Sequence, residues 1–203
     1  MTRPDGFWDA RYSESGFAYG TDPNDFLAEV VDRIPPGPVL CLGEGEGRNA
    51  VFLAGRGFDV TAVDASRVGL DKAGALARER GVRITTLHAD ITRLPIAPGA
   101  WSGIVSLWVH MVAGARAPLH RACVAGLAPG GAFVFEAYTP RQLEFRTGGP
   151  DTVDRLVSLE TVRVELAGLD LEIARELDRD IHEGRFHEGR GAVVQVLGRK
   201  AGR

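Results

Sequence analysis

The stretch from Val39 to Ala54, VLCLGEGEGRNAVFLA, places three glycines at alternate positions between an apolar run and a segment with helical spacing. This order predicts a β-strand that turns directly into a helix. Gly43, Gly45 and Gly47 lack a Cβ atom, so a ligand could lie against the bare backbone and its N–H groups. A tight turn with positive φ angles would need the same glycines. The ligand interpretation predicts a site for a nucleotide-like cofactor here.

Strand and helix patterns alternate through the first two thirds of the chain. The pattern predicts strands at 39–43, 59–64, 83–90, 103–108 and 132–138, and helices at 23–34, 48–56, 66–80 and 117–131. Ser66 is expected to cap the third of these helices, and glycine is expected to stop the fourth. This alternation is typical of right-handed crossovers that build a parallel sheet.

The pattern changes after Tyr138. Residues 139–157 are irregular and rich in Gly and Pro, and they follow the carboxyl end of a strand, where open α/β sheets bind ligands. We expect them to form a lid or substrate loop. A helix follows, and two extended runs at 169–180 and 191–200 then predict an antiparallel pair that closes the sheet. The apolar face of that helix is predicted to contain Leu159, Val162, Leu166 and Leu169.

Length and composition favour one globular domain over residues 1–203. The chain is 44% hydrophobic, which is enough for a substantial core. A formal net charge of -3 without a basic stripe argues against binding to nucleic acid. No apolar run is long enough to cross a membrane, and the first residues lack the apolar segment of a signal peptide, so we expect a cytoplasmic protein. Cys41 and Cys123 are expected to be buried free thiols.

Motif spacing separates the possible cofactors. The dinucleotide fingerprint requires a glycine where this chain has Arg48, and a P-loop is absent. Asp64 ends the second strand, where its carboxylate could accept hydrogen bonds from two ribose hydroxyls. Bound NAD would use the same acid, and an Asp that caps the next helix is the alternative. Asp90 closes the third strand and is a candidate acceptor for an adenine amino group, with Ile91 beside the ring.

The segment LGEGEGRN has the alternate-glycine form of the first motif of class I S-adenosylmethionine-dependent methyltransferases. The chain resembles this family throughout, and most of all the tellurite-resistance-like or thiopurine-methyltransferase-like small-molecule branch. The motifs that carry the resemblance are FWDARY, AYGTDPNDFL, LCLGEGEGRNAVFLA, TAVDAS, HADI, RTGGP and GAVVQVLGRK.

This resemblance implies a Rossmann-like, seven-stranded, mostly parallel sheet with one antiparallel strand and helices on both faces. It also implies that residues 1–36 form an N-terminal helical cover, in which FWDARY and AYG lie over the methionine part of S-adenosylmethionine. The cofactor-binding residues predicted on this basis are Trp8, Arg11, Tyr19, Gly43, Glu44, Gly45, Gly47, Asn49, Asp64, Ala65, Ser66, Ala89, Asp90, Ile91, Ser106 and Leu107.

One position departs from the family pattern. Many class I enzymes have an acid two residues before the first glycine, where it helps to hold the methionine ammonium, and this chain has Cys41 there. Glu44 or a backbone carbonyl is expected to take over that role.

Candidate groups for the methyl acceptor lie beyond the fourth strand. His110 follows that strand, where a general base or a substrate-orienting group would face the transferred methyl, although a packing histidine is the alternative. Arg146 in RTGGP could bind an anionic acceptor, although a solvated surface arginine would look the same, and Arg141 is a weaker candidate. Trp8 and Trp108 are candidate walls of the cofactor site or packing residues.

The segment HEGRFHEGR, residues 182–190, could suggest a metal site because it repeats its histidine and glutamate. Its two histidines are five residues apart and match no helical zinc motif, so we expect a polar turn and no metal. His187 or Arg190 could nevertheless reach the acceptor pocket.

The resulting hypothesis is an S-adenosylmethionine-dependent methyltransferase for a small acceptor, as a monomer or weak dimer. A sulfur, selenium or tellurium nucleophile is preferred on the family resemblance alone. The alternatives are an O- or N-methyltransferase, a protein that binds S-adenosylmethionine without catalysis, and a nicotinamide oxidoreductase.

Overall fold

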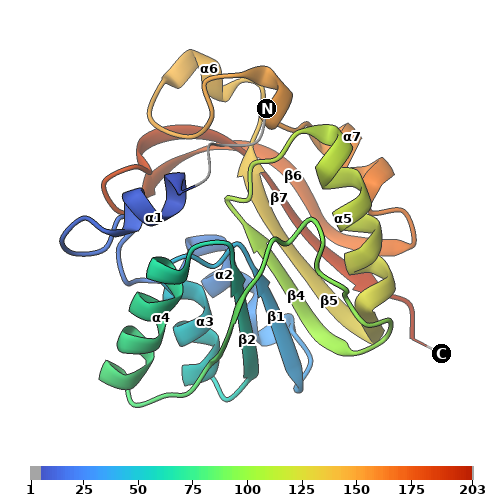
Figure 1. Ribbon diagram of the computed structural model, residues 1–203. Coiled ribbons are helices and arrows are strands. Elements are labelled where there is room, and N and C mark those ends of the chain that lie inside the picture. The colour runs from blue at the N-terminus through green and yellow to red at the C-terminus, as the bar shows by residue number, and fades with distance from the viewer. Residues whose placement is uncertain (1–5, 203) are drawn as a thin grey trace.

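The strand order places the carboxyl ends of the parallel strands side by side. In the computed structural model, which describes residues 6–202, the seven strands form a single sheet in the order β3-β2-β1-β4-β5-β7-β6 (Figure 1). The strands are β1 (Pro38–Leu42), β2 (Asp59–Asp64), β3 (Thr85–His88), β4 (Trp101–Leu107), β5 (Leu127–Tyr138), β6 (Leu169–His182) and β7 (Glu188–Lys200). Strand β7 pairs antiparallel with β5 and β6, and the other pairs are parallel. The predicted fold class is confirmed.

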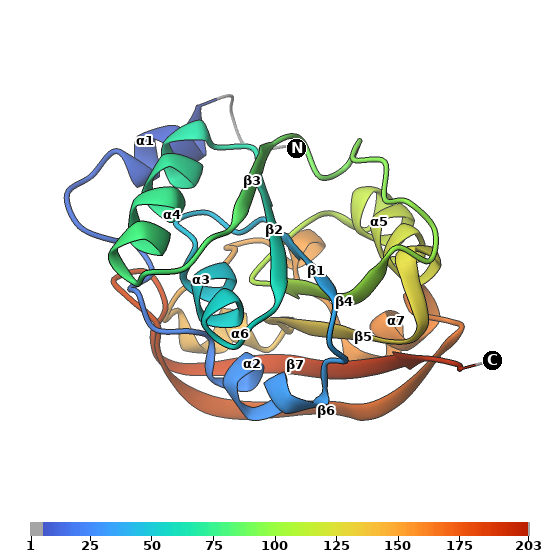
Figure 2. The ribbon, with the colours of Figure 1, turned by 90° about the horizontal axis from the view of Figure 1, so that it is seen from below.

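The helices cover both faces of this sheet (Figure 2). The α-helices are α1 (Phe7–Tyr12), α2 (Asp25–Val30), α3 (Arg48–Gly55), α4 (Arg67–Glu79), α5 (Ala113–Gly126), α6 (Gln142–Phe145) and α7 (Leu159–Glu165). Two 3-10 helices, η1 (Val31–Arg33) and η2 (Val153–Arg155), complete the set within the described range. Helices α2, α3 and α4 supply the core on one face of the sheet, and α5 and α7 supply it on the other.

The alternation of side chains in β1 shows how one strand serves both cores. Val39 and Cys41 lie in the cluster with α2 and α3, whereas Leu40 and Leu42 lie in the cluster with α5 and α7. Successive side chains of a strand point to opposite faces, so a strand that is buried on both sides is apolar throughout. The two cysteines, Cys41 and Cys123, are buried and free, as predicted.

Helices α5 and α7 end earlier than predicted. Helix α5 begins at Ala113 and ends at Gly126, because buried Leu127 takes extended backbone angles and pairs with Trp101 in the sheet. The expected glycine stop therefore lies several residues earlier than predicted. Leu169 is not on the face of α7, because that helix ends before it and Leu169 begins β6.

The functional end of the molecule is set by strand direction. Strands β1, β2, β4 and β5 end at the same edge of the sheet, and α1 and α6 lie beyond that edge (Figure 1). Helix α2, predicted as part of the cover over residues 1–36, instead packs into the core, and residues 1–5 lie outside the described range. Within residues 6–202 no helix is long and apolar enough to span a membrane.

Candidate functional site

A cavity of about 990 Å³ lies at the carboxyl ends of the parallel strands. This volume is at the upper end of the range for ligand pockets, which is consistent with room for a cofactor and a small second molecule. One side is formed by α1 and the loops after β1, β2 and β3. The other side is formed by residues 107–112, residues 148–151, Arg155 and the β6–β7 connection. We call these the cofactor half and the acceptor half.

The glycine loop is explained by the protein itself. Gly43, Gly45 and Gly47 have φ angles of 62°, 60° and 91°, a region that other residues rarely adopt. A Cβ atom at these positions would meet, in order, Val109 Cγ2 at 2.8 Å, Tyr12 Oη at 2.5 Å and Ala73 Cβ at 2.5 Å. The turn and its packing already require glycine at these three positions. The glycines alone are therefore not evidence for a bound ligand.

Asp64 links this loop to the start of α4. Its Oδ2 accepts the N–H of Gly45 and its Oδ1 accepts the N–H of Ser66, both at 2.8 Å. Burial raises the pKa of this carboxyl, whereas the backbone N–H groups lower it. Each carboxylate oxygen has a second lone pair, so the side chain can still accept hydrogen bonds from a ligand in the cavity that it lines.

Glu44 places a carboxylate beside the position where the family pattern has an acid. The thiol of Cys41 hydrogen-bonds to Glu44, and Glu44 Oε1 accepts the N–H groups of Asn49 and Ala50 at 3.0 and 2.8 Å. These N–H groups belong to the first turn of α3, which favours a negative charge. Burial nevertheless raises the pKa of Glu44 to about 7. Glu44 lines the cavity. The site therefore has a carboxyl group at position 44, although position 41 is a cysteine.

The N-terminal cover is attached to the glycine loop through Glu46. Its Oε2 accepts the N–H of Ala18 at 2.7 Å, and its Oε1 pairs with Lys72 at 2.9 Å. Within the cover, Trp8 stacks on Tyr12 with ring centroids 5.7 Å apart. Lys72 also donates to the carbonyls of Glu14 and Gly16, so Glu46 and Lys72 together attach the cover to the glycine loop and α4.

Trp108 turns the chain sharply at the end of β4. Its φ of 59° is unusual for a residue other than glycine. Its backbone N–H donates to the carbonyl of Glu136 at 2.9 Å, and its Nε1 donates to Glu183 Oε2 at 2.7 Å. Strained backbone of this kind persists only where surrounding contacts hold it. The turn places residues 109–112 along the cavity wall.

Glu183 lies at the centre of a buried ionic network that the sequence did not predict. It pairs with Arg48 of α3 and with Arg179 of β6, and Arg179 also pairs with buried Glu136 of β5. Burial by itself raises the pKa of Glu183. The two arginines outweigh this effect and bring the pKa down to about 2. The carboxylate is therefore ionised and holds the start of α3 against the β6–β7 connection.

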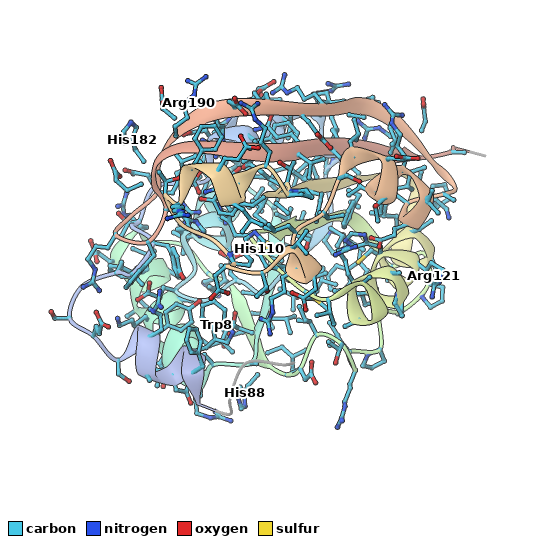
Figure 3. The ribbon with its side chains drawn as sticks, turned by 90° about the horizontal axis from the view of Figure 1, so that it is seen from above. Trp8, His88, His110, Arg121, His182 and Arg190 are labelled. Carbon is cyan, nitrogen blue, oxygen red and sulfur yellow. The ribbon has the colours of Figure 1, made fainter. Side chains whose placement is uncertain are left out.

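The predicted acceptor-side residues have different positions. His110 lines the cavity near the centre of the view in Figure 3, and its Nε2 accepts the N–H of Tyr138 at 3.3 Å. Arg146 is exposed and lies outside the cavity lining, because it ends α6 with a φ of 57°. Arg155 of η2 lines the cavity instead, and no motif marked it. Arg141 is exposed and pairs with Asp178.

The predicted cofactor residues can be sorted by whether they line the cavity. Those that do are Trp8, Arg11, Tyr19, Gly43, Glu44, Gly47, Asn49, Asp64, Ala65, Asp90, Ile91 and Leu107. Those that do not are Gly45, Ser66, Ala89 and Ser106. Gly45 and Ser66 contribute through Asp64, and Ser106 is buried within β4. Phe7, Asp9 and Tyr12 of the predicted cover segment FWDARY also line the cavity, and so do Thr92, Met111 and Phe186, which were not among the named candidates.

The segment at 182–190 is not a uniformly polar turn. His182 and Arg190 lie at the outer edge of the molecule in Figure 3, with 72% and 53% of their side chains accessible, and neither lines the cavity. Glu183 and His187 are buried, and only His187 of the two lines the cavity. Within the described part of the chain, no group of three or more His, Cys, Asp or Glu residues is arranged to hold a metal ion.

Comparison with known proteins gives matches that include the glycine loop. Residues 39–131 match the family model of a methyltransferase domain. A 56-residue segment is 43% identical to the ubiquinone biosynthesis O-methyltransferase of Rickettsia canadensis, and covers 28% of this chain and 24% of that protein. The match thus spans about a quarter of that relative.

Solved structures resemble nearly the whole chain. A protein described for conversion of a disulfide bond into a thioacetal group during echinomycin biosynthesis has a TM-score of 0.79 at 18% identity, over 97% of this chain and 91% of that one. An S-adenosylmethionine-dependent methyltransferase from Methanosarcina mazei has a TM-score of 0.71 at 13% identity, over 86% and 98%. At these identities the likeness concerns the fold.

Residues 39–131 thus resemble a methyltransferase domain, and the chain as a whole shares the fold of a solved S-adenosylmethionine-dependent methyltransferase. The alternative of a nicotinamide oxidoreductase has no support in these matches.

Proposed function

We propose that this protein transfers a methyl group from S-adenosylmethionine to a small acceptor that binds in the acceptor half of the cavity. The observation that carries the proposal is the continuity of the two halves in one cavity of about 990 Å³. A bound cofactor and an acceptor could therefore meet without intervening protein.

The residues of the cofactor half fit the chemistry of S-adenosylmethionine. Asp64 offers free lone pairs for ribose hydroxyls, and Asp90 with Ile91 offers an acceptor and an apolar surface for adenine. Glu44 offers a carboxyl group for the methionine ammonium. When bound, the cofactor supplies a methyl group on a sulfonium; the acceptor's lone pair forms the new bond to carbon, and the electron pair of the broken bond stays on sulfur.

The chain's contribution to the reaction is mainly positioning. Holding two reactants in line is worth on the order of 7 to 11 kcal/mol in intramolecular analogies, and this displacement needs little covalent help. Nε2 of His110 accepts the N–H of Tyr138 at 3.3 Å, so the lone pair of this nitrogen is engaged and does not serve as a general base in this arrangement. This favours an acceptor that arrives with an available lone pair.

We propose a soft acceptor, a thiol or an oxyanion of selenium or tellurium, in keeping with the resemblance of the sequence motifs to the tellurite-resistance-like branch. The conversion of a disulfide bond into a thioacetal group, for which one structural neighbour is described, is consistent with a sulfur acceptor. An O-methyltransferase is the second candidate, because the matched Rickettsia relative is named as one. We further propose a cytoplasmic monomer or weak dimer that does not bind nucleic acid, consistent with the net charge of -3.

Turnover assays test this function. The purified protein is incubated with S-adenosylmethionine and thiophenol, tellurite or catechol, and S-adenosylhomocysteine is measured. We expect product with thiophenol or tellurite. Product with catechol alone would favour O-methylation, and binding of S-adenosylmethionine without product would favour a non-catalytic binding protein.

Asp64→Ala tests the cofactor half in the same assay. Calorimetry should show S-adenosylhomocysteine binding weakened by about 1.5 to 3 kcal/mol, the scale of hydrogen bonds to a charged group. Asp59→Ala is the matched control, because Asp59 is the exposed residue at the other end of β2. Equal affinity of the two variants would contradict the assignment of Asp64 to the ribose.

A further inference from the structure

His187 lies where three separate segments meet in the acceptor half. Its carbonyl accepts the N–H of Glu183 at 2.8 Å, and its backbone forms an isolated antiparallel bridge with Gly148 of the loop before η2. Its ring centroid lies 4.8 Å from that of Tyr19 in the cover and 4.7 Å from that of Trp108. Only 6% of the residue is exposed, and the residue lines the cavity.

The Nδ1 atom of His187 is buried and has no hydrogen-bond partner among residues 6–202. A buried polar atom without a partner is costly, so it points to a group that joins it from the cavity. His110 differs in this respect, because Tyr138 N–H occupies its Nε2. Of the two cavity histidines, His187 therefore has a ring nitrogen without a partner among the described residues, whereas Nε2 of His110 has one.

The surroundings of His187 keep its ring uncharged. Burial, with smaller contributions from His110, Arg48 and Arg179, lowers its pKa to about 3 against the opposing effect of Glu183. At neutral pH the ring therefore has one N–H donor and one lone-pair acceptor. It can make a directional hydrogen bond, but it is too weak a base to take a proton from a thiol or a phenol.

We propose that His187 Nδ1 hydrogen-bonds to a polar atom of the methyl acceptor and orients the acceptor for transfer without removing a proton from it. The inference rests on the proposed function and deepens it. It assigns the acceptor class as a compact molecule that fits between aromatic walls, such as Trp108 and Phe186, and whose nucleophilic atom is already deprotonated when it binds. An aromatic thiolate or a chalcogen oxyanion meets both conditions.

Side-chain shape allows a sharp test of the nitrogen involved. In His187→Asn the amide nitrogen or oxygen lies near the position of Nδ1, whereas in His187→Gln it reaches toward Nε2. His187→Phe keeps a ring without either nitrogen. With thiophenol as acceptor we expect kcat/KM to fall about tenfold or more in His187→Phe and His187→Gln, the scale of one hydrogen bond, and to be largely restored in His187→Asn.

The chain supplies a matched control in His182, which lies on the same connection but is exposed and paired with Glu188. His182→Phe should leave kcat/KM and KM unchanged. Calorimetry with S-adenosylhomocysteine should give the same affinity for all His187 variants, which separates acceptor binding from loss of the cofactor site. The pH profile of kcat/KM should have the same midpoint in His187→Asn as in the parent protein, because no proton is taken by the ring.

A readout without turnover keeps this inference distinct from the proposed function. In protein labelled with ¹⁵N-histidine and saturated with S-adenosylhomocysteine, thiophenol or tellurite should shift the ring nitrogen resonances that are missing in His187→Asn. Shifted resonances without any turnover would support acceptor binding at His187 and contradict the methyltransferase activity. Unchanged resonances with both probes, full activity of His187→Phe, or rescue by Gln rather than Asn would overturn the inference.

Discussion

Glu44 has a pKa of about 7, so its charge changes within the range in which the protein would work. A cation bound beside it favours the ionised form, so binding of the methionine ammonium would release a proton. For a group with this pKa, we expect the affinity for S-adenosylhomocysteine to weaken about tenfold from pH 8 to pH 6.

Calorimetry at both pH values, in two buffers of different ionisation enthalpy, measures the affinity and the released proton together. The pH dependence should disappear in Glu44→Gln. A parent protein whose affinity is the same at pH 6 and pH 8 would show that Glu44 does not face the ammonium. The raised pKa also has a stability consequence with a definite sign: the contribution of Glu44 to the free energy of unfolding decreases as pH rises from its usual pKa of 4.5 through about 7.

The sequence could not distinguish the two halves of HEGRFHEGR. The motif gives His182 and His187 identical neighbours on one side, yet the first is exposed and the second is buried. The difference arises from where the β6–β7 connection meets Arg48 and the cover, which are distant in sequence. The position of Asp64 was easier to predict, because it follows from the strand that this residue ends.

Helix caps connect local sequence to the site at the scale of elements. Ser66 caps α4 by accepting the N–H of Gly69, and its Oγ also donates to Asp9 of the cover at 2.5 Å. Ser158 caps α7 in the same way through Thr161, outside the cavity lining. Replacement of either serine by alanine should cost about 1 kcal/mol of unfolding free energy.

Only Ser66→Ala should also weaken S-adenosylhomocysteine binding, because of the two serines only Ser66 hydrogen-bonds to the cover, through Asp9. Urea unfolding measures the first effect and calorimetry the second, and Ser158→Ala controls for the loss of a cap as such. Equal ligand affinity in both variants would mean that Asp9 and Ser66 do not hold the cover in place.

Elements with local signals were predicted well. Strand β2 and the Ser66 cap of α4 follow from alternation and from a capping side chain. Helix α5 was not bounded correctly, since Val112 at its N-cap makes no side-chain cap and Leu127 leaves the helix to pair with β4. Sheet pairing between distant residues decided that boundary, and a single sequence carries no direct sign of it.

At the scale of the whole molecule, Glu183 connects segments from all parts of the chain. It contacts Arg48, Trp108 and Arg179, and Asn24 Nδ2 also donates to it at 3.0 Å. Removal of one partner of a buried ion pair leaves the other uncompensated and typically costs about 3 to 5 kcal/mol. Glu183→Gln should lower the unfolding free energy by about this amount.

Glu188→Gln is the matched control, since Glu188 has the equivalent place in the repeat but an exposed side chain; we expect a change within about 0.5 kcal/mol. The sign with pH follows from the lowered pKa of Glu183: its contribution is complete above the usual 4.5 and is lost as pH falls toward about 2. Urea titrations at pH 7 and pH 3 measure both. A Glu183→Gln variant as stable as Glu188→Gln at pH 7 would contradict this account of the network.

The reversed direction of β7 determines how the protein can be attached to a solid support. Because β7 runs antiparallel to β5, Lys200 lies at the edge of the sheet remote from the cavity. Residues of the cover, within 6–20, line the cavity instead. A biosensor chip that captures the molecule through its last residues would leave the mouth facing the flowing solution. Capture through its first residues would tether the cover and hinder the entry of both reactants.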